Sequence, residues 1–180
     1  MKKILILVLS LVLCLVAVSV FAENDEVQVV DWETDILPQL GDNVNMGDFY
    51  IYENFGMKVW IPNNMKQVDV TAEEAASGYA DRFITEDEKY VISVFSNDIG
   101  KDFDTYFNDL QTESDIESVK RGKINGLNAI FYHRISSDQE VFSFTGGDNW
   151  VVELYFSPAT DADFATFIQI IAASVQALSE

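Results

Sequence analysis

The stretch from Ile116 to Phe156 constrains the fold more than any other, because it predicts consecutive antiparallel strands. Its clearest signal is Asn125-Gly126, which separates a strand-like run at 117–124 from a second run at 127–135. Asn-Gly between two such runs favours a tight hairpin, since both central residues of a type I′ turn need a positive φ. A hairpin is therefore expected here.

This hairpin predicts a cross-strand register. With the residues that flank the turn facing each other, Glu117 lies opposite Arg134 and Ser118 lies opposite His133. The first pair has opposite charges, which attract across a strand pair. The second pair places a serine near the only histidine of the chain.

Two further strands extend the hairpin into a meander. Turn residues at 136–138 and 146–148 delimit strands at 139–145 and 150–156. The strand at 127–135 carries apolar residues on both faces, which predicts cover on both faces of the sheet. We expect helices to provide that cover.

The N-terminal segment is typical of a secretory signal. Lysines precede an apolar run from Ile4 to Phe21, and Val20-x-Ala22 fits a cleavage site. We expect residues 1–22 to be removed and the protein to be secreted or otherwise extracytoplasmic. The alternative is an uncleaved anchor, because the run approaches the roughly 18 to 20 residues that span a bilayer. Membrane association is expected only in that case.

The charge of the chain limits its partners. The sequence has 180 residues and a formal net charge of −19, and removal of two lysines with residues 1–22 makes this −21 (−19 minus 2). Such a surface repels nucleic acid and anionic membranes. Cys14 is the only cysteine and lies in the signal, so the mature chain has no disulfide, thiolate nucleophile or cysteine metal site.

Four more segments surround the meander. Residues 23–48 are acidic and predict a partly ordered lead-in with one short helix and with Trp32 as an anchor. Residues 49–61 and 79–96 predict two hairpins. Three helices are expected as well, and their N-termini are marked by capping residues.

The helix starts follow from those caps. Residues 71–74 have capping-box spacing, and Asp102 fits an N-cap. A second capping box at 160–163 opens a terminal helix whose apolar stripe continues to Leu178. The length remaining after the signal is that of one ordinary domain.

Three motifs mark the region from residue 49 onward. They are Phe-Gly-x5-Pro at 55–62, Ile-Asn-Gly-x-x-Ala at 124–129 and a Phe-rich terminal helix. With the order of elements, they resemble the PsbP-like, or Mog-type, fold family over about residues 49–178. The resemblance implies an α+β fold for a single domain at 49–180, in which a central antiparallel sheet of meander and hairpins is sandwiched between helices (α/β/α).

The same resemblance bears on function only weakly. Members of the family are accessory or binding proteins, and many secreted bacterial members have no assigned role. The matching motifs are turn and core residues, so no catalytic motif is carried over. No residue is assigned a catalytic role.

Residues with chemical potential each have a plain structural interpretation. His133 has a serine nearby but no Gly-x-Ser-x-Gly elbow, so it is interpreted as a structural or surface histidine. Many acids lie at predicted helix N-termini, where the helix dipole favours them. A two-carboxylate hydrolase acting on an extracellular polymer is the alternative, although no apolar surroundings single out an acid pair.

Two candidate binding sites remain. Asp98, Asp102 and Asp104 form an oxygen-rich segment that could bind calcium, but the spacing is not that of an EF-hand. Trp60 and Tyr155 combine an aromatic ring with a polar edge and are the candidates for a groove that binds a peptide or glycan. No metal site or other cofactor is predicted.

The sequence thus predicts a non-enzymatic extracytoplasmic binding or accessory domain. Its expected partner is an unknown protein, peptide or glycan outside the cell, and not nucleic acid. A calcium-stabilised structural module is a further alternative.

Overall fold

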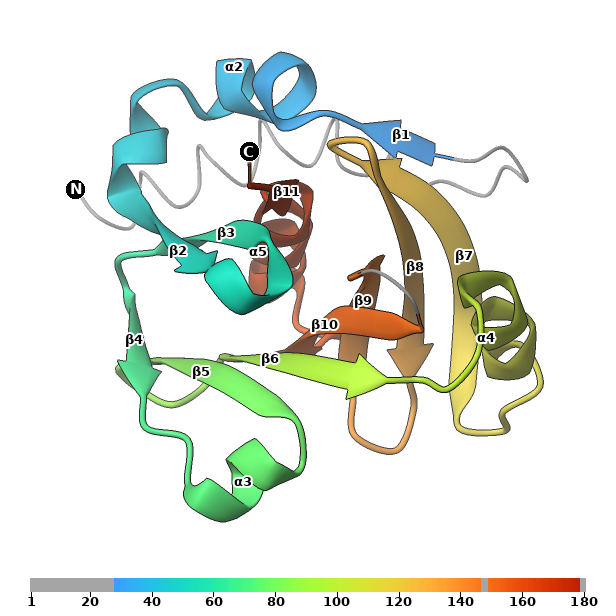
Figure 1. Ribbon diagram of the computed structural model, residues 1–180. Helices are drawn as coiled ribbons and strands as arrows, with labels where there is room; N and C mark the ends of the chain where they lie inside the picture. The colour runs from blue at the N-terminus through green and yellow to red at the C-terminus, as the bar shows by residue number, and fades with distance from the viewer. Residues whose placement is uncertain (1–27, 147–148, 179–180) are drawn as a thin grey trace.

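The computed structural model describes residues 28–146 and 149–178, which form two sheets with helices packed on them (Figure 1). The large sheet consists of β1 (Gln28–Val30), β4 (Met65–Val68), β5 (Tyr79–Thr85), β6 (Val91–Asp98), β7 (Ile116–Ile124), β8 (Leu127–Arg134), β9 (Gln139–Thr145) and β10 (Trp150–Ser157). The small sheet consists of β2 (Gly47–Tyr52), β3 (Met57–Pro62) and β11 (Gln176–Ala177). The helices are η1 (Trp32–Ile36), α2 (Leu37–Leu40), η2 (Gly41–Met46), η3 (Glu53–Phe55), α3 (Ala72–Ala76), α4 (Phe103–Leu110) and α5 (Ala162–Ala173).

The meander forms the middle of the large sheet. The eight strands of the large sheet are ordered β1-β7-β8-β9-β10-β6-β5-β4, and those of the small sheet are ordered β11-β3-β2. The predicted antiparallel meander is confirmed, and β9 has the predicted bounds. The sheet as a whole is mixed rather than antiparallel, because β1 pairs with β7 in parallel.

The first hairpin of the meander contains a β-bulge. The predicted register holds from the turn to Lys120, which faces Phe131, but Glu117 then faces His133. The predicted pairs of Glu117 with Arg134 and of Ser118 with His133 are wrong, because the bulge inserts one residue into β7. Ser118 lies in the bulge with φ of 56°.

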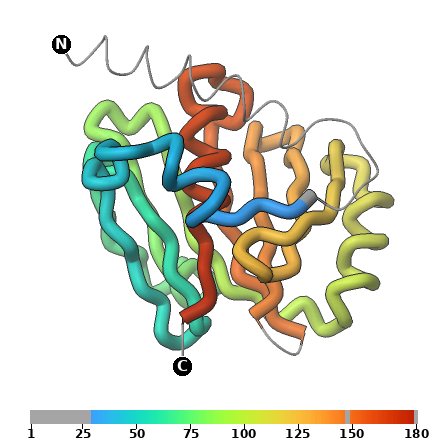
Figure 2. Tube along the Cα trace, turned by 90° about the horizontal axis from the view of Figure 1, so that it is seen from above, coloured from blue at the N-terminus to red at the C-terminus, as the bar shows by residue number. Residues whose placement is uncertain are grey.

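Both faces of the meander are buried. Ala129 and Phe131 of β8 belong to the main core, which includes α5 and the small sheet. Ile130 and Tyr132 belong to a second cluster with Leu110 of α4. Figure 2 shows α5 between the small sheet and the meander, with α4 on the far side of the meander.

The predicted lead-in is part of the fold. Gln28 to Val30 add a strand to the large sheet, and Trp32 is 2% exposed. The Trp32 ring packs against Phe49 and Trp60, with centroids 5.9 and 6.2 Å apart. The folded domain therefore includes residues 28–48, which the sequence predicts to lie before it.

The ends of the helices agree only partly with the prediction. The capping box of Thr71 and Glu74 and the N-cap at Asp102 are confirmed. The terminal helix is capped by Asp161, whose side chain accepts from the backbone N–H groups of residues 163 and 164, and not by Thr160. It ends at residue 173 instead of continuing to 178, because the chain then pairs with β3 as β11.

In the two described ranges, no helix is both long and apolar enough to cross a membrane. The predicted signal segment at 1–22 lies outside them. So do two residues of the predicted turn at 146–148.

Candidate functional site

The two aromatic residues predicted to form a groove lie apart. Trp60 is 4% exposed, and its Nε1–H donates to the carbonyl of Val44 at 3.0 Å. Tyr155 packs in the cluster under α4 and donates to Glu153. Trp60 is buried because the lead-in, which sequence reasoning placed outside the domain, covers β3. The two rings therefore share no groove.

The three acids of the predicted cation loop have other interactions. Asp98 accepts from the backbone N–H of Gly100 at 2.9 Å, and Asp102 caps α4. Asp104 pairs with Arg121 at 2.6 Å. Within the part of the chain that the structure describes, no group of three or more acids, histidines or cysteines is arranged to hold a metal.

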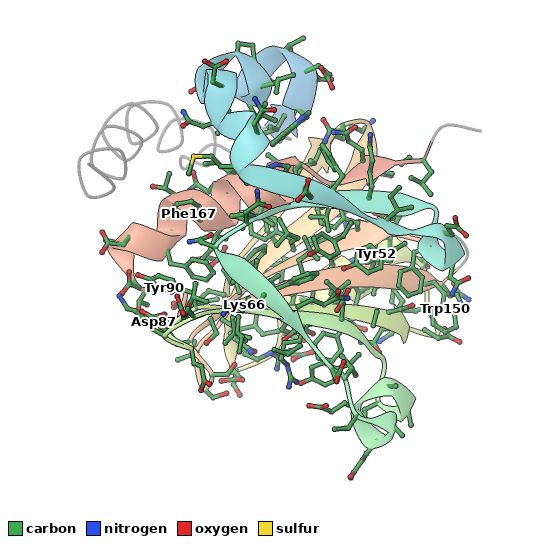
Figure 3. The ribbon with its side chains drawn as sticks, turned by 90° about the vertical axis from the view of Figure 1, so that its left-hand side faces the viewer. Tyr52, Lys66, Asp87, Tyr90, Trp150 and Phe167 are labelled. Carbon is green, nitrogen blue, oxygen red and sulfur yellow. The ribbon has the colours of Figure 1, made fainter. Side chains whose placement is uncertain are left out.

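An aromatic groove does exist at another place, which we call the Trp150 groove. Its volume is about 500 Å³, and it lies between α3 and the start of β10. Trp150 is 48% exposed, whereas the other tryptophans, Trp32 and Trp60, are 2% and 4% exposed. Figure 3 shows Trp150 at the edge of the molecule, at the same end as Tyr52. The lining residues are Phe55, Ala75, Ala76, Ser77, Gly78, Tyr79, Ala80, Ser96, Asn97, Asp98 and Trp150.

Small residues keep the Trp150 groove open. Gly78 has φ of 97°, and a Cβ there would lie 2.9 Å from the carbonyl oxygen of Ser96. The backbone N–H of Ser96 donates to Gly78 at 2.9 Å, so this close approach is fixed. Ala80 follows in an irregularity of the β5–β6 pairing. The alternation of the strand in sequence does not reveal such a bulge, which explains why the groove was missed.

A second cavity, the Glu140 cavity, lies between α5 and strands β7, β8 and β9, with a volume of about 210 Å³. Burial raises the pKa of Glu140 to about 7; Lys120 opposes this rise and Glu117 adds to it. His133 Nδ1 lies 3.6 Å from the Glu140 carboxylate. The lining residues are Ser118, Lys120, Phe131, Glu140, Phe142, Ala159, Ala165, Ile168 and Gln169.

A fully buried carboxylate lies beneath α4. Glu153 of β10 is 1% exposed and is surrounded by hydrogen-bond donors. Burial and the Glu153 carboxylate raise the pKa of Tyr106 and Tyr155 well above the usual tyrosine value, so both hydroxyls keep their protons. The donors to Glu153 are Asn97, Tyr106, Tyr132, Ser143 and Tyr155. Because these contacts of Glu153 all lie within the domain, we interpret this cluster as structural.

Comparison with known proteins identifies the architecture. No family model and no curated protein matches the sequence. Among solved structures, the solution structure of cyanobacterial PsbP (CyanoP) from Synechocystis sp. PCC 6803 matches with a TM-score of 0.53. The fold is PsbP-like. The match covers 73% of this chain and 92% of that chain at 16% identity, so it concerns the fold alone.

The PsbP-like fold predicted from the motifs is therefore confirmed. Neither the sequence motifs nor the structural match indicates the residues that line the Trp150 groove. Exposed Trp150 was available in the sequence as the first residue of a strand, but its exposure depends on what packs beside it.

Proposed function

We propose that this protein is a non-enzymatic, extracytoplasmic binding or accessory domain that binds a peptide or glycan in the Trp150 groove. The observation that carries the proposal is the 48% exposure of Trp150 beside the rings of Phe55 and Tyr79. The signal predicted at residues 1–22 supports the compartment. The Mog-type grouping and a three-layer α/β/α arrangement belong to the same proposal.

The lining of the Trp150 groove suits such a ligand. Aromatic rings offer flat apolar faces, and the side chains of Ser77, Asn97 and Asp98 add polar groups at its edge. Binding sites commonly combine aromatic walls with a few polar groups that orient the ligand. Sugar rings and extended peptides both present apolar faces and polar edges.

The lining also favours binding over hydrolysis. A glycosidase mechanism needs a pair of carboxyl groups roughly 5 to 9.5 Å apart. Among the described residues, the Trp150 groove is lined by one acid, Asp98, and the Glu140 cavity by one acid, Glu140. A binding domain requires no such pair.

Tryptophan fluorescence tests the proposal directly, because Trp150 is the exposed tryptophan of the described residues. The protein is titrated with soluble oligosaccharides, muropeptides and basic peptides. We expect one of these ligands to change the emission. Calorimetry, which needs no tryptophan reporter, should then show that Trp150→Ala weakens its binding at least tenfold, as for a central aromatic contact. Ile135→Ala is the matched control, because Ile135 is 51% exposed and does not line the groove.

Two results would overturn this function. One is binding that is equally tight in the Trp150→Ala variant. The other is that no ligand of the panel binds, while a protein captured from cell envelopes binds the wild type and the Trp150→Ala variant equally tightly.

A further inference from the structure

We propose that the Glu140 cavity binds a small primary ammonium ion with a compact apolar body, such as an arylalkylamine. This site is separate from the Trp150 groove, because the two linings share no residue. The shape of the cavity, its apolar wall and its hydrogen-bond acceptors point to this ligand.

The cavity follows from the local structure of two elements. β7 bulges at Ser118, which interrupts the regular pairing with β8 along one wall. The opposite wall carries two small side chains, Ala159 before α5 and Ala165 within it. Asp138, in the turn between β8 and β9, fixes the segment before α5. Its carboxylate accepts hydrogen bonds from the Thr160 hydroxyl at 2.9 Å and from the Thr160 backbone N–H at 3.1 Å. A regularly paired β7 or larger side chains at these two alanines would fill this space.

The apolar wall limits the ligand to a compact body. Phe131, Phe142 and Ile168 are 4%, 2% and 3% exposed and belong to the main core. The volume of about 210 Å³ is somewhat larger than a dry cavity of ~150 Å³, which accommodates benzene. One ring with a short side chain therefore fits.

Two acceptors make the cavity suitable for a donor. Gln169 Oε1 is shielded from solvent and has no hydrogen-bond partner among the described residues. A buried acceptor without a partner costs free energy that a ligand donor would recover. The Glu140 carboxylate lines the same cavity, with 31% of its side chain exposed. A primary ammonium group supplies several donors for these two acceptors.

The charges around Glu140 favour a cation. On β7, Glu117 and Lys120 act on it in opposite directions. On β8, His133 lies 3.6 Å away, and Asp138 lies 4.0 Å from that histidine. The α5 residues of the lining, Ala165, Ile168 and Gln169, carry no charge. Besides Glu140 itself, Glu117 and Asp138 add negative charge on this side of the sheet and Lys120 adds one positive charge, on a chain of net charge −19.

The ionisation of Glu140 gives the site a pH dependence. Its pKa of about 7 means that the carboxylate forms fully only above neutral pH. An alkylamine keeps its proton up to about pH 10. Affinity for the amine should therefore rise as the pH increases from 6 to 8.

The test compares 2-phenylethylamine with 2-phenylethanol, which has the same skeleton without the charge. Binding to the full mature chain is followed by backbone amide NMR shifts and calorimetry. We expect the amine to shift signals of β7–β9 and α5 and to bind at least tenfold more tightly than the alcohol at pH 8. Glu140→Gln should remove this preference, and Ala165→Leu should block both ligands by filling the cavity.

His133→Gln tests whether Glu140 alone accounts for the pH dependence. If Glu140 governs the site, this variant keeps the rise in affinity between pH 6 and 8, and Glu140→Gln loses it. Equal binding of amine and alcohol, or NMR shifts confined to the Trp150 groove, would overturn the proposal. Failure here leaves the Trp150→Ala test unaffected, since the sites are separate.

Discussion

Replacing Glu153 with leucine should destabilise the protein strongly. The carboxylate is 1% exposed, and its hydrogen-bond donors among the described residues are all neutral side chains. Its stability in this position depends on hydrogen bonds from neutral donors. Leucine fills similar space but accepts none of them.

The magnitude follows from the donors that lose their acceptor. Tyr132 and Ser143 are 1% and 0% exposed, so neither hydroxyl can turn to water after the substitution. Each buried donor left unsatisfied costs about 1–3 kcal/mol. The partly exposed donors, such as Tyr155, recover part of their loss from solvent. Removing the cost of burying a charge offsets some of the total, which leaves about 2–4 kcal/mol.

Urea denaturation at pH 7, followed by far-UV circular dichroism, measures this change. A loss of 2–4 kcal/mol corresponds to a decrease in Tm of roughly 4–16 °C for a domain of this size. Glu153→Gln, which keeps one acceptor oxygen, should cost about half as much. Glu86→Gln is the control, because the Glu86 side chain is 89% exposed.

A Glu153→Leu variant within 1 kcal/mol of the wild type would refute the reasoning. It would mean that the cost of burying the charge balances the hydrogen bonds, as happens for some buried ion pairs.

Three further predictions follow from other contacts. Asn125→Gly should cost about 2–4 kcal/mol in urea denaturation although glycine suits the turn. Asn125 Oδ1 accepts from the backbone N–H of Trp32, and its Nδ2 donates to the carbonyls of Ala173, at the end of α5, and Val175. Since the pKa of Glu140 rises from 4.5 to about 7 on folding, the native state binds the extra proton, and the free energy of unfolding should fall by about 1–3 kcal/mol between pH 4.5 and 7. Glu140→Gln should flatten that pH profile, and a profile unchanged by the substitution would contradict the assignment. Calcium or a chelator should leave the Tm unchanged, because Asp98, Asp102 and Asp104 have other partners. A rise in Tm with calcium would instead support a calcium-stabilised structural module.

Local chemistry explains why the meander could be predicted. Asn125 and Gly126 have φ of 50° and 81°, as a type I′ turn requires. Thr71 and Glu74 form their capping box within one turn of helix. Each of these features depends on residues close in sequence, so a single chain segment suffices to reveal it.

Elements that depend on distant partners could not be predicted. β1 is three residues long and exists because β7 offers an unpaired edge. β11 likewise replaces the end of the predicted helix because β3 lies beside it. A segment of two or three residues has too little pattern to be distinguished from a loop.

The exposure of the tryptophans likewise could not be predicted from sequence. Trp60 and Trp150 both lie on strands, and alternation cannot say which of them another segment covers. The lead-in packs on Trp60, and nothing among the described residues covers Trp150 to that extent. The predicted groove failed for this reason.

The sequence by itself determined the Asn125-Gly126 turn, the caps at Thr71 and Asp102 and the order of the meander, because backbone conformation and hydrophobic periodicity act over a few residues. Its motifs also carried the resemblance to the PsbP-like fold. Only the tertiary structure decided where β7 bulges, which tryptophan is exposed and that Glu140 and Gln169 line one cavity. These properties depend on burial by segments that are distant in sequence, and burial sets both the accessibility of a ring and the pKa of an acid.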